Sequence, residues 1–140
     1  MPALIPEDYL PDVHARLILY KRIASATDED GLKDLQVEMI DRFGLLPEPT
    51  KNLIRLTLLK LQAEQLGIKK VDGGPQGGRI EFATDTPVDP LALIKLIQGQ
   101  PKRYKFEGAT LFKFMVPMER PEERFNTLEA LFERLTPKSA

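Results

Sequence analysis

The residues of this sequence that could do chemistry are mostly carboxylates, and three of them share one face of an expected helix. Asp34, Glu38 and Asp41 stand at positions i, i+4 and i+7 of the segment that ends at Gly44, so they form one acidic stripe. Like charges at this spacing weaken an isolated helix by roughly 0.2–0.5 kcal/mol per pair, and a basic partner would offset that cost. The stripe is either a solvated helix face, the commoner case, or a contact surface.

The other candidate catalytic groups do not assemble into a recognisable active site. His14 is the only histidine and the sequence contains no cysteine, so neither a multi-histidine site nor a thiolate metal site can form within one chain. Ser25 has no nucleophile elbow around it. We therefore expect a domain that is not an enzyme and that holds no cofactor or metal of its own.

A glycine-rich stretch over residues 73–78 could suggest a phosphate-binding loop. Such a loop requires Gly-Lys followed by Ser or Thr and then a helix, whereas here Gly78 precedes Arg79 and a short β-branched and aromatic run. This context favours a loose hairpin tip.

A second hairpin combines basic and aromatic residues and allows two interpretations. Arg103, Tyr104 and Lys105 on one strand and Lys113 on the other could form a stacking platform for single-stranded nucleic acid. Strand alternation, however, places the aromatic side chains on one face, where helices are available to cover them. Packing in the core is the favoured interpretation, and a nucleic-acid-binding accessory module is the alternative.

Composition limits the possible partners and the compartment. The 140 residues include 20 Lys and Arg against 21 Asp and Glu, which gives a net charge of −1 and no overall basic field for DNA or anionic lipid. No apolar run approaches the roughly 20 residues that span a bilayer, and the N-terminus lacks the basic region of a signal peptide. We expect a cytoplasmic monomer without direct DNA binding or membrane association.

Periodicity predicts the order of the elements. Prolines at positions 2, 6 and 11 favour an extended connector over residues 1–11, followed by a single domain over residues 12–140. In the first helix Val13, Leu17, Tyr20 and Ala24 are the expected buried stripe, and Thr27 is the expected cap of the second. The third helix is expected to be the most buried. The expected elements are helices at 12–26, 28–43 and 50–66, strands at 68–71 and 79–82, a helix at 90–98, strands at 104–107 and 112–116, and a helix at 121–136.

This order predicts an α+β fold in which helices pack on a small antiparallel sheet formed by two hairpins, αααββαββα. Short segments between residues 3 and 82 also resemble one known family, and the resemblance extends to the end of the chain. The segments are ALIPEDYLPD at 3–12, YKRIA at 20–24, IDRFGLLP at 40–47, AEQLGI at 63–68 and IEF at 80–82. In this order they are similar to the C-terminal domain of the bacterial transcription-repair coupling factors, the Mfd family.

The resemblance implies a regulatory role. Full-length members are ATP-driven DNA translocases that displace stalled RNA polymerase and recruit the repair protein UvrA through an N-terminal UvrB-like module. Their C-terminal domain is expected to dock on that module and mask its UvrA-binding surface. The present sequence lacks the Gly-Lys-Ser/Thr loop of the motor, so ATP and magnesium are not expected to bind here. Glu38, Asp41 and Arg42 match the family's charged contact surface, and Asp34 extends it.

Overall fold

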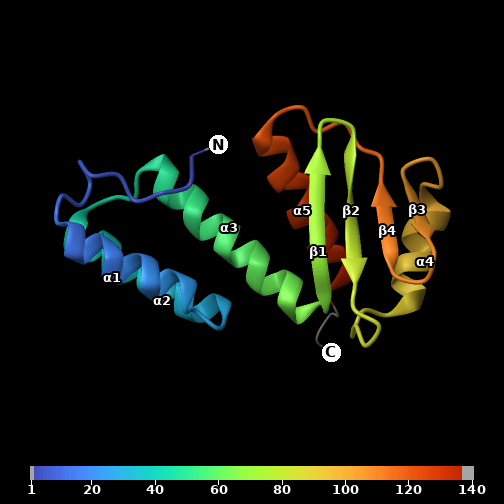
Figure 1. Cartoon of the computed structure of the whole chain (residues 1–140), viewed down its shortest axis with the longest axis horizontal. Coiled ribbons are helices and arrows are strands. Elements are labelled where there is room, and N and C mark those ends of the chain that lie inside the picture. The colour runs from blue at the N-terminus through green and yellow to red at the C-terminus, as the bar shows by residue number, and fades with distance from the viewer. Residues whose placement is uncertain (1, 137–140) are drawn as a thin grey trace. The chain divides into compact units, whose positions relative to one another are not determined.

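The computed structural model describes residues 2–136 and confirms the predicted fold class (Figure 1). The chain divides into two compact units between Leu61 and Gln62, a boundary that falls inside the third helix. The elements are α1 (Val13–Ala24), α2 (Glu29–Phe43), α3 (Glu48–Gln65), β1 (Ile68–Gly74), β2 (Gly77–Phe82), α4 (Pro90–Gly99), β3 (Tyr104–Glu107), β4 (Leu111–Phe114) and α5 (Pro121–Leu135). The division into a connector over residues 1–11 and one domain over residues 12–140 stays a prediction.

Side-chain caps set where the first two helices begin. The Asp12 carboxylate accepts a hydrogen bond from the His14 amide, and the Asp28 carboxylate accepts one from the Gly31 amide at 2.7 Å. The cap of α2 is therefore Asp28 rather than Thr27. An Asp cap also places a negative charge at the positive end of the helix dipole, which a Thr cap would not.

The helical unit packs around one apolar core, to which α1 contributes a different face from the expected one. Leu19 and Ile23 are buried, whereas Val13 and Leu17 are more than half exposed. Residues 17–20 are all apolar, so two overlapping stripes fit the helical period, and packing selects the one that contains Leu19. The buried members of this core are Ile5, Leu10, Leu19, Ile23, Leu32, Leu35, Met39, Leu46, Ile54 and Leu61.

Residues 2–10 pack on the helical unit and form hydrogen bonds with it. Ile5 and Leu10 are buried in its core. The Leu4 amide donates to the Pro49 carbonyl at 3.0 Å, and Thr50 Oγ1 donates to the Leu4 carbonyl at the same distance. These bonds place the extended N-terminal segment against the first turn of α3.

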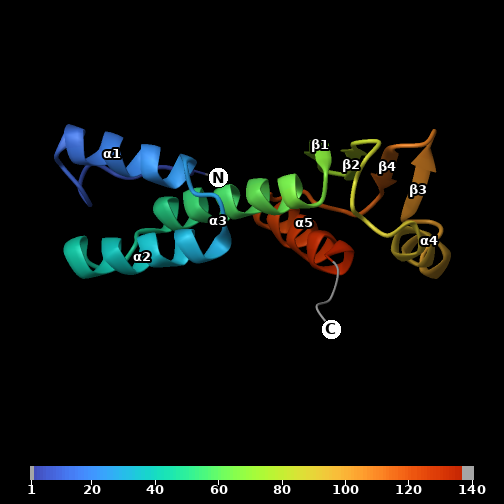
Figure 2. The ribbon, with the colours of Figure 1, turned by 90° about the horizontal axis from the view of Figure 1, so that it is seen from below.

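The second unit contains a four-stranded antiparallel sheet in the order β1-β2-β4-β3. Figure 2 shows α4 and α5 on the same side of this sheet. The aromatic residues Tyr104, Phe112 and Phe114 are buried on that side, and Tyr104 stacks on Phe112 with ring centroids 5.6 Å apart. The opposite face of the sheet carries the charged residues of the strands, because side chains alternate along each strand.

Candidate protein-interaction site

The acidic stripe predicted on the second helix lies on the outer face of α2. Asp34 and Asp41 are exposed, whereas Leu35 and Met39 point into the core. Neither aspartate makes an ion pair with another residue of the described part of the chain, 2–136. Two carboxylates therefore stand on this helix without an ion-pair partner among residues 2–136.

Glu38, the central member of the stripe, has a cationic partner within the chain. Arg22 on α1 donates to Glu38 Oε2 through Nη1 and to Oε1 through Nη2, the second bond being 3.3 Å long. Arg42 Nη1 lies 3.9 Å from the same carboxylate. The hydrogen bond with Arg22 lowers the pKa of Glu38, with help from the charges of Arg22 and Arg42. Glu38 is therefore less available to an outside partner than the two aspartates.

Arg42 is positioned by an aromatic pair. Its guanidinium lies 4.9 Å from the centroid of the Phe43 ring, and the Tyr9 ring meets Phe43 edge-on at 6.2 Å. The Tyr9 hydroxyl in turn donates to the Gly44 carbonyl at 2.9 Å. The contact with Phe43 holds the side chain of Arg42 in place. This side chain nevertheless remains more than half exposed, so a partner can contact it.

The residues of the nucleic-acid alternative do not form a stacking platform. Tyr104 is buried on the side that carries α4 and α5, as the core interpretation expects, so its ring is closed to a nucleobase. Lys105 and Lys113 lie on the other face, and both neighbour the Glu107 carboxylate. Arg103 is exposed just before β3. Basic and aromatic residues of this hairpin are thus separated onto opposite faces.

No group of three or more His, Cys, Asp or Glu residues that could hold a metal ion is found within residues 2–136. No helix in the described part of the chain is both long and apolar enough to cross a membrane.

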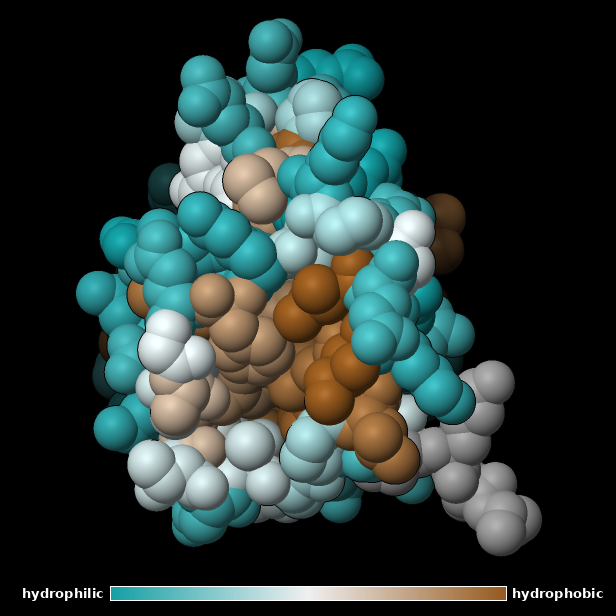
Figure 3. Space-filling view, turned by 90° about the vertical axis from the view of Figure 1, so that its right-hand side faces the viewer, coloured by the Kyte–Doolittle hydropathy of each residue, from teal (hydrophilic) through white to brown (hydrophobic). Residues whose placement is uncertain are grey.

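Apolar side chains gather on the side of the sheet unit that Figure 3 shows. Leu91 and Ile94 of α4 are 62% and 46% exposed. Beside Ile94 a cavity of about 310 Å³ opens between α4 and the turn that joins β3 to β4, with Leu93 and Phe106 among its lining residues. The sheet unit thus has an apolar side that is distinct from its charged sheet face.

The fold recurs in a solved structure. The crystal structure of a C-terminal domain of transcription-repair coupling factor superposes with a TM-score of 0.77, and the match covers 96% of this chain and 87% of that one. The two sequences are only 22% identical over this match, so the comparison establishes a shared α+β architecture and nothing finer.

Sequence comparison establishes the family. The TRCF domain family matches residues 1–93. The transcription-repair-coupling factor of Escherichia coli (strain K12) is 44% identical over 96% of this chain, and that of Haemophilus influenzae (strain ATCC 51907 / DSM 11121 / KW20 / Rd) is 52% identical over 82%. The chain belongs to the TRCF domain family. It spans 12% and 10% of the lengths of these two relatives.

Proposed function

We propose that this chain is the non-catalytic, autoinhibitory domain of a transcription-repair coupling factor and acts in the cytoplasm in transcription-coupled DNA repair. It docks on the UvrB-like N-terminal module of the same full-length protein and masks the UvrA-binding surface of that module. Engagement of RNA polymerase by the full-length protein releases it. ATP and magnesium belong to the motor of the full-length protein and not to this domain.

The observation that carries this proposal is the acidic surface of α2, on which Asp34 and Asp41 are exposed and have no cation within the described residues. Charge that is not compensated inside the domain favours a basic partner surface. Membership of the TRCF domain family supplies the context in which that partner is the UvrB-like module.

The residues of α2 divide into two roles under this proposal. Asp34, Asp41 and Arg42 contact the module, because their charged groups are exposed. Glu38 acts mainly as a positioning residue, since its carboxylate holds Arg22 and lies near Arg42. A polar contact of this kind suits a surface that must be released, because interfaces built on exposed charge are weaker and more salt-dependent than apolar ones.

A calorimetric titration of this domain into the separately expressed UvrB-like module tests the partner. We expect binding that weakens between low and physiological salt, and a loss of about tenfold in affinity when Asp34 and Asp41 are both replaced by Lys. Glu133→Lys on α5 is the matched control, because it reverses an exposed carboxylate of the other unit. Equal losses in the control and in the double variant would remove the assignment to α2.

Masking itself requires the full-length protein, because a weak contact within one chain relies on the effective concentration that tethering provides. In a full-length protein that carries Asp34→Lys and Asp41→Lys, binding to UvrA should rise without RNA polymerase or ATP. Circular dichroism of the isolated double variant should match that of the wild type. A folded variant whose UvrA binding is unchanged would contradict the autoinhibitory role.

A further inference from the structure

The N-terminal segment, residues 2–10, reaches the last turn of α2. Within the segment, the amides of Tyr9 and Leu10 donate to the Pro6 carbonyl at 3.2 and 3.1 Å, which closes a tight turn. Leu10 is buried and holds this turn in the apolar core of the helical unit. Tyr9 is thereby placed beside the end of α2.

Tyr9 contacts the end of α2 through both its hydroxyl and its ring. The hydroxyl donates to the carbonyl of Gly44, the C-cap of the helix, at 2.9 Å, and it lies 3.3 Å from the Met39 carbonyl. Gly44 has a φ of +94°, a conformation that ends the helix, so this hydrogen bond fixes the turn at which α2 stops. The Tyr9 ring meets the Phe43 ring edge-on, with the two centroids 6.2 Å apart.

Phe43 is also the residue against which Arg42 lies. The guanidinium carbon of Arg42 is 4.9 Å from the centroid of the Phe43 ring. Asp41 stands one position earlier on the same turn and makes no ion pair within residues 2–136. Tyr9, Phe43 and Arg42 thus form a continuous series of contacts from the N-terminal segment to the charged surface of α2.

The other end of the segment is held by buried polar side chains of α3. Thr50 is fully buried, and its Oγ1 donates to the Leu4 carbonyl at 3.0 Å. Asn52 is 4% exposed, and its Nδ2 donates to the Pro2 carbonyl at 2.9 Å. A buried polar group that loses its partner costs free energy, so these bonds make the position of the segment part of the folded state. The segment is therefore attached to α3 at one end and to α2 at the other.

We propose that the N-terminal segment regulates the docking of α2. While the segment is in place, Tyr9 holds Asp41 and Arg42 where they contact the UvrB-like module, and displacement of the segment weakens that contact. A surface that is already held in its binding position loses less conformational freedom on binding, so its affinity is higher. This role rests on the proposed function, in which the segment connects the domain to the rest of the full-length protein. A movement of that protein after it engages RNA polymerase reaches α2 through the chain itself.

Calorimetric titration of the 140-residue chain into the UvrB-like module tests the role of Tyr9. All variants are compared at a temperature at which circular dichroism shows them folded. Tyr9→Ala should lower the affinity by about tenfold, because Arg42 and the end of α2 lose their support. Tyr9→Phe should keep most of the affinity, since its ring still contacts Phe43. Wild-type affinity in Tyr9→Ala would overturn the proposal.

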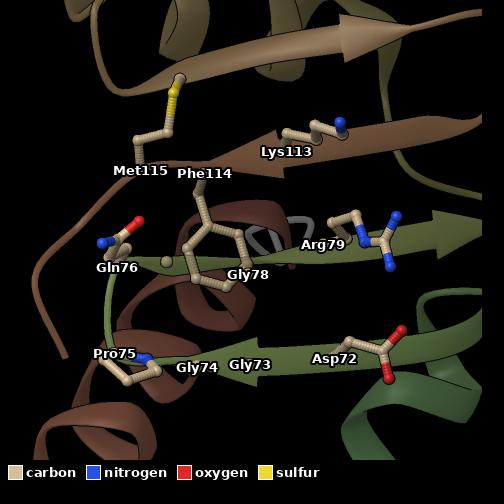
Figure 4. Close-up of a pocket in the computed structure, with 11 residues that line it drawn as sticks. Asp72, Gly73, Gly74, Pro75, Gln76, Gly78, Arg79, Lys113, Phe114 and Met115 are labelled. Carbon is tan, nitrogen blue, oxygen red and sulfur yellow. The ribbon is translucent and has the colours of Figure 1, made fainter. Parts of the chain in front are cut away.

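Two variants control for loss of stability alone. Thr50→Val removes the hydrogen bond to the Leu4 carbonyl without touching α2. Gly77 lies at the turn of the β1–β2 hairpin, beside the open cavity that Figure 4 shows, and a Cβ there would lie 2.0 Å from the Phe114 carbonyl oxygen. Gly77→Ala therefore strains the sheet unit. Both variants should bind the module as tightly as the wild type, and a loss in either that equals the loss in Tyr9→Ala would overturn the proposal.

A second readout separates the role of Tyr9 from the proposed function. NMR relaxation of Arg42 Nε reports the picosecond-to-nanosecond mobility of the guanidinium in the chain alone. This mobility should rise in Tyr9→Ala and keep its wild-type value in Tyr9→Phe and Thr50→Val, and an unchanged mobility in Tyr9→Ala would overturn the positioning role. A wild type that does not bind the module contradicts the proposed function itself. A wild type whose binding is weakened by Asp34→Lys with Asp41→Lys, but not by Tyr9→Ala, overturns only the role of Tyr9.

Discussion

The guanidinium of Arg22 on α1 donates hydrogen bonds to both carboxylate oxygens of Glu38 on α2, although the two residues are 16 positions apart. This paired geometry is the strongest form of an arginine–carboxylate contact. The side chains of Arg22 and Glu38 are nevertheless 45% and 39% exposed, so water and salt screen the pair. The pair links α1 to α2 at the surface of the helical unit, whose core is formed by buried apolar side chains such as Ile23 and Met39.

The Arg22–Glu38 pair makes the stability of the chain sensitive to acid. Because Arg22 holds the pKa of Glu38 below its usual value, the unfolded chain binds the proton more readily, and the stabilising contribution is lost as the pH falls through the lowered pKa. Urea titrations between about pH 5 and pH 3, the range around the ordinary glutamate pKa, should show a steeper loss for the wild type than for Glu38→Gln. Glu133→Gln, the matched control on α5, should follow the wild type. Parallel curves for the wild type and Glu38→Gln would contradict the pair's contribution.

Replacement of two neighbouring leucines of α3, Leu56 and Leu59, should lower the free energy of unfolding by different amounts. Leu59 is 7% exposed, whereas Leu56 is only half-buried. Leu59→Ala should cost about 2–5 kcal/mol of unfolding free energy, as cavities at buried leucines do, and Leu56→Ala should cost less. Urea denaturation of both variants measures this difference. A larger loss at Leu56 would mean that the burial of α3 is wrongly assigned.

The glycines of the sheet unit should respond in opposite directions to alanine. Gly77→Ala combines a positive φ with the overlap on the Phe114 oxygen and should destabilise the chain by about 2 kcal/mol or more. At Gly99, the last residue of α4, a Cβ would have no neighbour within 4 Å. Gly99→Ala should stabilise by about 0.5–1 kcal/mol through the higher helix propensity of alanine. Thermal unfolding of the two variants gives the comparison.

Tyr9 should contribute through its hydroxyl as well as its ring. The hydroxyl donates to the Gly44 carbonyl at 2.9 Å and lies 3.3 Å from the Met39 carbonyl. Tyr9→Phe keeps the edge-on contact with Phe43 and removes only the hydrogen bonds, so we expect a loss of about 1 kcal/mol. Tyr9→Ala should cost more, because it also removes the ring. Equal losses in the two variants would assign the whole effect to the hydroxyl.

If the chain binds no cofactor of its own, neither a chelator nor added nucleotide should change its melting temperature. Tight native-state ligands raise the melting temperature by mass action. We therefore expect the same melting temperature for the 140-residue chain with and without EDTA, and with and without ATP and magnesium. A shift of several degrees in either experiment would reveal a site that the proposed function does not include.

Periodicity predicted the elements well because each helix and strand carries its own local signal. The sequence could not decide which stripe of α1 is buried, since residues 17–20 are all apolar and only packing distinguishes Leu17 from Leu19. It also could not predict that Glu38 is held by Arg22, because that pair depends on how α1 lies against α2. The acidic stripe could be predicted from the sequence, since positions i, i+4 and i+7 share a face in any α-helix.

The hydrogen bonds that hold residues 2–10 on the helical unit should slow amide hydrogen exchange in this segment. Chain termini usually exchange their amide hydrogens within the fastest phase, because they fray independently of the core. Here the Ile5 amide donates to the Tyr20 hydroxyl at 2.7 Å, and Asn52 Nδ2 donates to the Pro2 carbonyl at 2.9 Å. The amides of Leu4 and Ile5 should therefore exchange as slowly as those of the first turns of α3, as members of one cooperative unit.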